Sequence, residues 1–321
     1  MSEGPIAIVS RVTRVLPGWN EMIERATAAG HPVHDEIGTG RTVADLSDAV
    51  AGSIVGLVIS AEPCDAAAFS RMPRLRALSC IGSGIDHVDL DAAEAHGVTI
   101  LRGVGGNAEA VADHALAMLL GLTRGIRLAQ EALHDGRGWT PWPPIVPRDL
   151  RSLTLGVVGL GNIGTAVARR GVALGMQEVV FNDPYVAAAP AGIDARRLEL
   201  AELLEEADVV TLHTPLTDET RGLIGPAEIA RMRPDALLLN LSRGGVLVEQ
   251  AAFAALESGR LGGVGLDVLE REGPTAPPPP ALPNLLVTPH MAGLSDRVAR
   301  ETRLAAMERL LDALAAAPAA A

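Results

Sequence analysis

A glycine-rich turn between a short apolar run and a helical pattern constrains this chain more than any other feature. The apolar run is residues 154–158, and Gly159, Gly161 and Gly164 follow it with the spacing G-x-G-x-x-G. In such a turn the first glycine permits a tight bend, the second lets the backbone approach a pyrophosphate, and the third lets the helix pack close to the strand. The N–H groups of a helix N-terminus favour phosphate. In this context the pattern predicts a dinucleotide site, whereas alone it would indicate only a tight turn.

An acidic residue lies where such a site needs one. Asp183 follows the next apolar run, residues 179–182, and comes nineteen residues after Gly164. A carboxylate at this position bonds the ribose hydroxyls of NAD and repels the 2′-phosphate of NADP. Residues 184–187 contain no cation that would offset this repulsion. The sequence therefore predicts NAD as the cofactor.

Short β-rich runs alternate with helical patterns along most of the chain. This alternation is typical of α/β proteins with parallel sheets, and 321 residues exceed the usual size of one domain. We therefore predict an α/β fold with two doubly wound parallel-sheet domains. The predicted strands are residues 6–9, 54–59, 77–81, 154–158, 179–182, 209–212, 237–241, 264–268 and 285–288. The longest predicted helices cover about residues 108–133 and 294–313.

Charge and cysteine content exclude several classes of protein. A formal net charge of −12 without a basic run opposes binding to nucleic acid. Cys64 and Cys80 lack metal-ligand spacing, so we expect no metal site, and a reduced, intracellular compartment fits best. The first residues lack a signal-peptide pattern, and no apolar run is long enough to span a bilayer. We expect a cytoplasmic protein that binds neither nucleic acid nor membrane.

Three segments place ionisable groups at predicted strand ends, where open α/β sheets bind their ligands. They read NLSRGG, LDVLEREGP and VTPHMAG. Together with the glycine turn and the segment LHTPLTDETRGLI, they resemble the D-isomer-specific 2-hydroxyacid dehydrogenase family. The segments CIGSGIDHVDLDAA and GNAEAVADHALAMLL match this family more loosely. The resemblance implies an NAD-dependent oxidoreductase that transfers a hydride between the nicotinamide and C2 of a small D-2-hydroxy acid or its 2-oxo acid.

The resemblance also implies three catalytic residues, Arg243, Glu272 and His290. The planar, permanently charged guanidinium of Arg243 would bind the substrate carboxylate and polarise the 2-oxo group. His290 would donate a proton to the developing alkoxide and accept it in the reverse direction. Glu272 would bond the imidazole and fix its tautomer.

The acid that accompanies His290 has a competitor two residues away. Glu272 lies five residues beyond Asp267, which is the spacing in the family motif. Glu270 does not have this spacing. The family commonly has proline directly after this glutamate, but here Gly273 comes before Pro274. We therefore expect Glu272 to be the acid, on a looser loop than in the family.

Less distinctive residues match the family pattern as well. Backbone amides of residues 82–84 would receive the substrate carboxylate, although a plain turn explains this loop equally well. The substrate-side residues are Gly82, Ser83, Gly84 and Asn107, with Arg243 and His290. Along the cofactor, the implied contacts are Asn162 and Ile163 at the pyrophosphate and Asp267 near the nicotinamide, with Thr214, Leu241, Ser242 and Gly293 also at the dinucleotide.

The resemblance implies that a Rossmann NAD-binding domain, residues 104–290, is inserted into a flavodoxin-like substrate domain, residues 1–103 plus 291–321. The active site would lie in a cleft that closes over the substrate and excludes water. A homodimer is expected, because the family resemblance and the long central helix both suggest one. Trp139 and Trp142 are expected to anchor their Gly- and Pro-rich loop on this subunit or on a partner.

The loop of residues 60–63 bears on substrate choice. The family resemblance implies that this loop faces the substrate, and it contains Glu62 and no cation. A buried phosphate dianion without a cation is costly, unless Arg102 or a residue of a partner chain supplies the charge. We therefore expect a small acid such as glyoxylate or hydroxypyruvate, with a phosphoglycerate dehydrogenase as the alternative. One alternative is an NAD(H)-sensing corepressor-like scaffold, which turnover on 2-oxo acids would distinguish. Another is a formate dehydrogenase, which a formate assay would distinguish.

Overall fold

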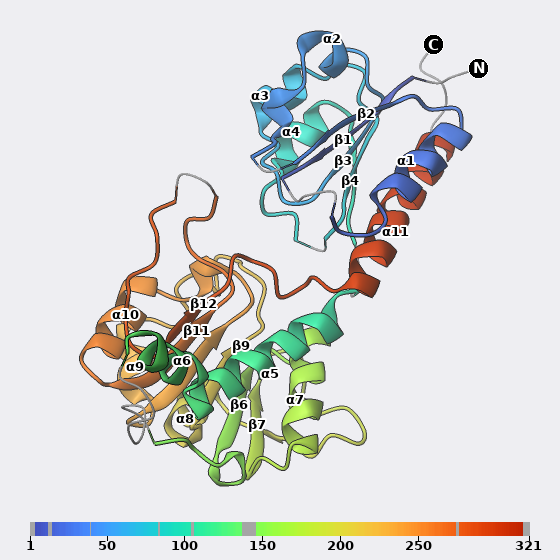
Figure 1. Ribbon diagram of the computed structural model, residues 1–321. Coiled ribbons are helices and arrows are strands. Elements are labelled where there is room, and N and C mark those ends of the chain that lie inside the picture. Colours follow the sequence, from blue (N-terminus) through green and yellow to red (C-terminus); the bar gives the residue numbers. More distant parts are fainter. Residues whose placement is uncertain are drawn as a thin grey trace. The chain divides into compact units, whose positions relative to one another are not determined.

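The chain forms two compact units. The computed structural model describes residues 4–11, 15–38, 40–82, 84–103, 106–136, 146–273 and 276–316. One unit comprises Met1–Gly106 with Leu294–Ala321, and the other comprises Asn107–Gly293 (Figure 1). The chain therefore passes from one unit to the other twice. Among the described residues, none of the helices combines the length and the hydropathy that a membrane span requires.

The first unit contains a five-stranded parallel sheet in the order β2-β1-β3-β4-β5. Its strands are β1 (Ile6–Ser10), β2 (Val33–Ile37), β3 (Gly56–Ile59), β4 (Ala77–Cys80) and β5 (Thr99–Leu101). This is the strand order of flavodoxin-like folds. One face of the sheet is covered by α1 (Trp19–Ala28) and α11 (Asp296–Ala316), and the other by α2 (Asp48–Ala51), α3 (Ala66–Ser70) and α4 (Leu90–Ala95).

Burial explains which strands of this unit were predictable. The central strands β1, β3 and β4 are buried throughout, and their short apolar runs are typical of strands that are covered on both faces. The edge strands β2 and β5 are partly exposed. Their sequences, VHDEI and TIL, lack a continuous apolar run, and the sequence prediction omitted both.

The second unit contains a seven-stranded sheet in the order β12-β11-β10-β9-β6-β7-β8. All of its pairs are parallel. From β6 the order runs outward in both directions, as in the Rossmann fold, and reverses between β6 and β9. Its strands are β6 (Thr154–Val158), β7 (Glu178–Asn182), β8 (Arg196–Arg197), β9 (Val209–Leu212), β10 (Ala236–Asn240), β11 (Leu261–Leu266) and β12 (Leu285–Val287).

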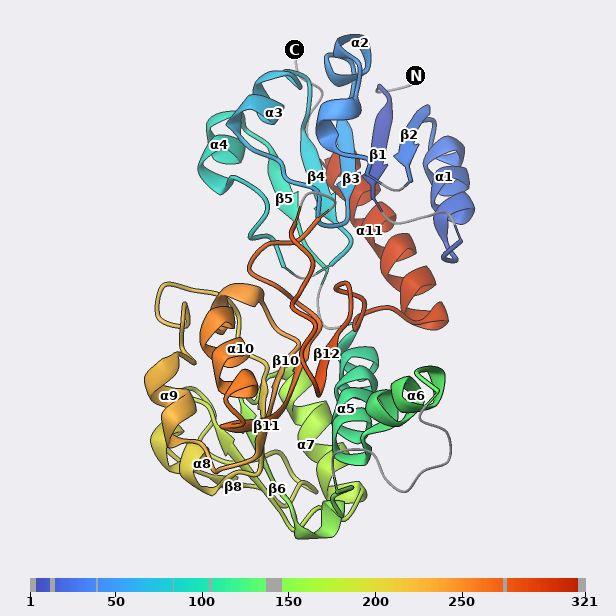
Figure 2. The ribbon, with the colours of Figure 1, turned by 60° about the vertical axis from the view of Figure 1, so that its left-hand side comes forward.

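Helices cover both faces of this sheet, so the predicted doubly wound α/β architecture is confirmed. Residues of α5 (Ala108–Arg124) and α7 (Asn162–Ala173) form one core with the sheet, and residues of α8 (Leu200–Glu206), α9 (Pro226–Arg231) and α10 (Glu249–Glu257) form another. Figure 2 shows these two groups on opposite sides of the strands.

The prediction of one continuous helix over residues 108–133 was wrong. The helix α5 ends at Arg124, and α6 (Ile126–His134) begins after Gly125. Gly125 has a φ of 62°, a left-handed conformation that interrupts a helix and that glycine adopts at little cost. Trp139 and Trp142 lie outside the residues that the structure describes.

Candidate active site

The carboxyl ends of the strands in the Asn107–Gly293 unit meet at one edge of the sheet, because all of these strands are parallel. In open α/β sheets, ligands bind at this edge near the point where the strand order reverses. Here that point lies between β6 and β9. The residues that follow the strands at this edge include Gly159, Asp183, Thr214, Arg243, Asp267 and His290.

The glycine turn has two kinds of glycine. A side chain at Gly164 would overlap the carbonyl oxygen of Gly159, so this glycine is needed for α7 to pack against the turn. At Gly161, a Cβ would meet no atom of the described residues within 4 Å. Gly161 precedes Asn162 and Ile163, the first two residues of α7. The space beside Gly161 is therefore open at a helix N-terminus, which suits an anionic ligand.

Asp183 is buried, with 8% of its surface exposed. Its carboxylate accepts hydrogen bonds from the main-chain N–H groups of Leu160 at 2.7 Å, Tyr185 at 2.8 Å and Val186 at 3.2 Å. These bonds connect the acid to the glycine turn and to its own loop. Close by, the Nε of Arg197 donates to the main-chain oxygen of Asp183 at 3.4 Å. A cation therefore does accompany Asp183, although residues 184–187 contain none.

Two polar atoms beside the turn lack partners. Within the described residues, Nδ1 of His213 and Oγ1 of Thr214 are buried without a hydrogen-bond partner. A side chain at Gly159 would come within 3.0 Å of the main chain of His213 and of Cγ2 of Thr214, so these two residues lie next to the turn. Unpaired buried polar atoms are unfavourable, and the polar groups of a bound dinucleotide would satisfy them. The residues at this edge thus fit NAD.

His213 itself is held neutral. Its Nε2 pairs with Oγ1 of Thr211 at 2.9 Å, and burial lowers the pKa of the imidazole to about 3. A histidine with this pKa does not exchange protons near neutrality.

His290 and Glu272 are brought together at the end of β12. Nδ1 of His290 lies 2.8 Å from a carboxylate oxygen of Glu272, and the other oxygen accepts from the main-chain N–H of Leu269 at 3.2 Å. The two side chains are 38% and 26% exposed, respectively. His290 also has a φ of 52°, a left-handed conformation uncommon outside glycine. Such conformations persist where the surrounding structure enforces them, often at functional sites.

The competing acid, Glu270, is directed elsewhere. Its carboxylate accepts from the main-chain N–H of Glu249 at 3.2 Å, and the carboxylate of Glu249 accepts from the main-chain N–H of Glu270. Gly273, where the family commonly has proline, has a φ of 110°. The proline ring fixes φ near −65°, so this loop follows a path that proline cannot adopt.

Asp267 fixes the loop that carries His290. The carboxylate is 2% exposed and accepts from the N–H of Met291 at 2.9 Å, the N–H of Ala292 at 2.8 Å and the hydroxyl of Thr288 at 2.5 Å. The same hydroxyl lies 3.0 Å from Nε2 of His114. His114, Thr288 and Asp267 thus form a chain of polar contacts under this loop. Neither His114 nor Thr288 was among the predicted site residues.

Arg243 lies in a turn that Asn240 organises. Asn240 is 1% exposed. Its side-chain oxygen accepts from the N–H of Ser242 at 3.1 Å and from the hydroxyl of Ser242 at 2.8 Å. Its side-chain nitrogen donates to the main-chain oxygen of Arg243 at 2.9 Å. Nη1 of Arg243 donates to the main-chain oxygen of Ser242 at 2.8 Å. A side chain at Gly244 would overlap the carbonyl of Leu269. The loop with Arg243 therefore touches the loop with Glu272. Asn240 was not among the predicted site residues.

The remaining predicted site residues fall into two groups. In the Asn107–Gly293 unit, a side chain at Gly293 would come within 2.8 Å of Nδ2 of Asn107, so these two residues lie side by side. In the other unit, Gly82 follows β4 and its carbonyl accepts from the N–H of Gly103 at 2.9 Å. Ser83 lies outside the described residues.

The expectation that Glu62 would face a substrate was wrong. The residue is 0% exposed. Its carboxylate accepts from the main-chain N–H groups of Arg11 at 2.7 Å, Ser60 at 2.6 Å and Ala61 at 3.1 Å. It therefore holds the loops after β1 and β3 together, and it says nothing about the charge of a substrate.

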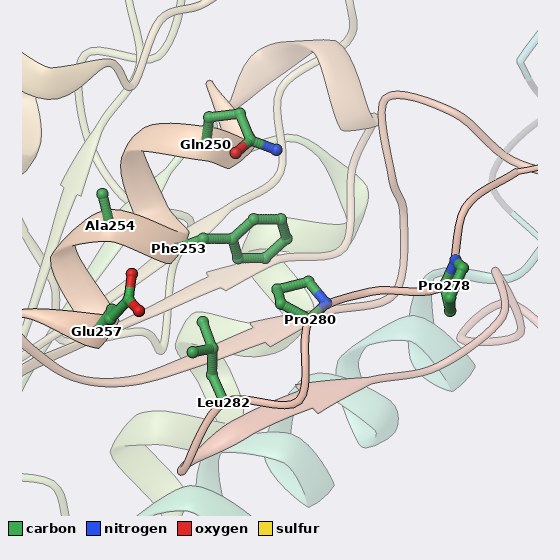
Figure 3. A pocket seen from close by; sticks show the side chains of 7 residues that line it. All are labelled: Gln250, Phe253, Ala254, Glu257, Pro278, Pro280 and Leu282. Atoms are coloured by element: carbon green, nitrogen blue, oxygen red, sulfur yellow. The ribbon is translucent and has the colours of Figure 1, made fainter.

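Other features do not extend the candidate site. A pocket of about 350 Å³ lies between α10 and residues 278–282 (Figure 3), and none of the predicted site residues lines it. Its lining is Gln250, Phe253, Ala254, Glu257, Pro278, Pro280 and Leu282.

The described residues contain no cluster of His, Cys, Asp and Glu suited to a metal ion. Burial raises the pKa of Cys64 and of Cys80 to about 12, which leaves both thiols unreactive.

Comparisons with known proteins agree with this geometry. Residues 116–292 match the D-isomer specific 2-hydroxyacid dehydrogenase, NAD binding domain. Glyoxylate/hydroxypyruvate reductase B of Enterobacter sp. (strain 638) is 36% identical over 277 residues, which are 85% of either chain. D-3-phosphoglycerate dehydrogenase of Bacillus subtilis (strain 168) is 37% identical over 254 residues, 78% of this chain but only 47% of that protein.

A solved structure extends the likeness to nearly the whole chain. D-lactate dehydrogenase from Aquifex aeolicus, complexed with NAD and lactic acid, has a TM-score of 0.83 and 25% sequence identity, and the match covers 95% of this chain and 93% of that one. The chain belongs to the D-isomer specific 2-hydroxyacid dehydrogenase family and is an NAD-dependent dehydrogenase.

Proposed function

We propose that this enzyme reduces the 2-oxo group of a small acid such as glyoxylate or hydroxypyruvate and oxidises the D-2-hydroxy acid in the reverse direction. The observation that carries the proposal is the contact of 2.8 Å between His290 and Glu272 at the carboxyl edge of the sheet. A carboxylate on Nδ1 fixes the tautomer of the imidazole and assigns proton exchange with the substrate oxygen to Nε2.

Arg243 would bind the substrate carboxylate and polarise the carbonyl group. Its guanidinium offers several donors in one plane, which matches a carboxylate. Asn240 holds the main chain at Arg243, so Asn240 would act as a positioning residue. On the substrate side we propose further contacts from the family resemblance, made by Gly82, Ser83, Gly84 and Asn107.

The cofactor would lie along the edge of the Asn107–Gly293 unit, which we propose as the NAD-binding domain, with the other unit as the substrate domain. When bound, the nicotinamide supplies or accepts the hydride at C2 of the substrate. Asp183 would bond the adenosine ribose, and Gly159, Gly161 and Gly164 with Asn162 and Ile163 would surround the pyrophosphate. Further contacts would come from Thr214, Leu241, Ser242, Asp267 and Gly293.

The preference for an unphosphorylated substrate rests on the relatives. Glyoxylate/hydroxypyruvate reductase B is 36% identical over 277 residues, and D-3-phosphoglycerate dehydrogenase, 37% identical over 254 residues, keeps a phosphorylated substrate as the alternative. We also propose a homodimer. Ile126 and Leu133 on α6 are 58% and 46% exposed, and exposed apolar side chains on a helix suit a subunit interface.

The test is NADH oxidation with glyoxylate, hydroxypyruvate, pyruvate, a bulky 2-oxo acid and phosphohydroxypyruvate in parallel. We expect the highest kcat/KM with glyoxylate or hydroxypyruvate. A higher value with phosphohydroxypyruvate would contradict the substrate assignment and indicate a phosphoglycerate dehydrogenase. Tight NADH binding without turnover on any of these acids would instead favour an NAD(H)-sensing scaffold.

A further inference from the structure

Arg197, in β8, lies beside the end of β7, where the proposed adenosine site begins. The short strand β8 pairs in parallel with β7, with Arg197 opposite Phe181. From this position Nε of Arg197 donates to the main-chain oxygen of Asp183 at 3.4 Å. The guanidinium therefore lies next to the residue that we propose binds the ribose of the cofactor.

Main-chain N–H groups surround the carboxylate of Asp183. Its two carboxylate oxygens accept from the N–H groups of Leu160, Tyr185 and Val186. Hydrogen bonds from backbone N–H groups stabilise a carboxylate and offset its charge. A phosphate close to Asp183 is therefore repelled less than the sequence alone suggests.

Arg197 has a longer ion pair than its neighbour Arg196. Within the described residues, the acidic partner of Arg197 is Glu199 at 3.7 Å, which is too far for a hydrogen bond. The Arg197 side chain is 38% exposed. Arg196 instead bonds Glu178 at 2.8 Å and Glu206 at 2.6 Å, and these carboxylates raise its pKa. Since successive side chains of a strand point to opposite faces, the two arginines face different surroundings.

We infer that Arg197 is a cation for the 2′-phosphate of NADP, so that this enzyme accepts NADP as well as NAD. The inference rests on the proposed function, because it assumes that Asp183 marks the adenosine ribose. It replaces the expectation, drawn from residues 184–187 alone, that NADP meets repulsion with no cation to offset it.

The experiment measures dissociation constants of NADH and NADPH by fluorescence titration for the unmodified enzyme, Arg197→Ala and Arg196→Ala. We expect Arg197→Ala to weaken NADPH binding about tenfold, the size of one charge-assisted hydrogen bond, and to change NADH binding less than about twofold. Arg196→Ala, one residue away on the same strand, should leave both constants unchanged. Arg197→Lys should retain part of the NADPH affinity, since it keeps the charge but loses the planar fork.

Failure of the inference is distinguishable from failure of the proposed site. Asp183→Asn should weaken NADH binding if Asp183 bonds the ribose. If it does, and NADPH does not bind or Arg197→Ala behaves like Arg196→Ala, only the role of Arg197 is overturned. If Asp183→Asn leaves NADH binding unchanged, the adenosine site itself is wrong and the inference falls with it.

Discussion

At the scale of single residues, two glutamates on one loop make the sharpest test of the proton-transfer site. Glu272 contacts His290, whereas Glu270 contacts the main chain at Glu249. We expect Glu272→Gln to lower kcat by roughly 100-fold, within the range of acid-base catalysis, and to leave the Kd for NADH unchanged. The matched variant Glu270→Gln should retain most of its activity. Steady-state kinetics and NADH titration measure both effects, and a larger loss in Glu270→Gln would contradict the assignment.

A second residue governs stability in acid. Burial lowers the pKa of His213 to about 3 from an ordinary value of 6.5, so the unfolded chain binds a proton at a pH where the folded chain does not. The neutral His213 therefore makes its full contribution to the free energy of unfolding above pH 6.5, and this contribution is lost as the pH falls toward 3. At pH 5 the loss is on the order of 2 kcal/mol.

The variant His213→Gln should remove this dependence. Glutamine can still pair with Thr211, but it does not titrate. We expect the melting temperature of the unmodified protein to fall more steeply between pH 7 and pH 5 than that of His213→Gln. The control is His34→Gln, which alters an exposed histidine and should leave the slope unchanged. Equal slopes in all three proteins would contradict the low pKa of His213.

At the scale of elements, the turn before α7 separates packing from cofactor binding. Gly164→Ala would drive a methyl group into the carbonyl of Gly159, and overpacking of this kind costs roughly 1–3 kcal/mol or more. Gly161→Ala meets no atom of the described residues within 4 Å. We expect Gly164→Ala to lower the melting temperature, and Gly161→Ala to keep it while weakening NADH binding. Unchanged NADH affinity in Gly161→Ala would argue against a pyrophosphate at this turn.

The loop after β12 offers another element to test. Thr288→Val removes the hydroxyl that bridges His114 and Asp267, and leaving buried polar groups unsatisfied costs roughly 1–3 kcal/mol. We expect kcat to fall because the loop with His290 loses a fixed contact, while the Kd for NADH changes little. Thr27→Val, which alters an exposed helical threonine, is the control. Normal kcat in Thr288→Val would show that Asp267 alone positions the loop.

Buried strands were predictable from the sequence, whereas three of the four edge strands, β2, β5 and β8, were not. The strand at residues 154–158 was predicted with the bounds that the structure gives, because a strand covered on both faces is a continuous apolar run. The exposed strand β8, with the sequence RR, carries no such signal. The break at Gly125 was missed because the apolar pattern continues through it into α6.

The candidate site was predictable where a motif specifies it. His290 and Glu272, proposed from motif spacing, do contact each other. Arg197 was not predictable as a neighbour of Asp183. The two residues are fourteen positions apart in the sequence, and only the pairing of β8 with β7 places them side by side. Glu62 was misjudged because its sequence position does not reveal that three backbone N–H groups bind its carboxylate.

At the scale of the whole molecule, each unit has its own hydrophobic core. Leu310 on α11 is 0% exposed and belongs to the core of the flavodoxin-like unit, and Leu203 on α8 is 0% exposed in the core of the Rossmann-like unit. Chains with two such cores commonly unfold in more than one transition. A ligand that binds one folded unit stabilises that unit, by about 2.7 kcal/mol when its concentration is 100 times its Kd.

Paired core substitutions should therefore separate the two units. Leu310→Ala and Leu203→Ala each remove a buried side chain, at a cost of roughly 2–5 kcal/mol. In differential scanning calorimetry, we expect two unfolding transitions, and we expect saturating NADH to raise the midpoint temperature of one of them. Leu203→Ala should lower the midpoint temperature of that transition. Leu310→Ala should lower the midpoint temperature of the other transition and leave the Kd for NADH unchanged. If instead both variants lower the temperature of a single NADH-sensitive transition equally, the two units unfold together, and NADH binding stabilises the flavodoxin-like unit as well.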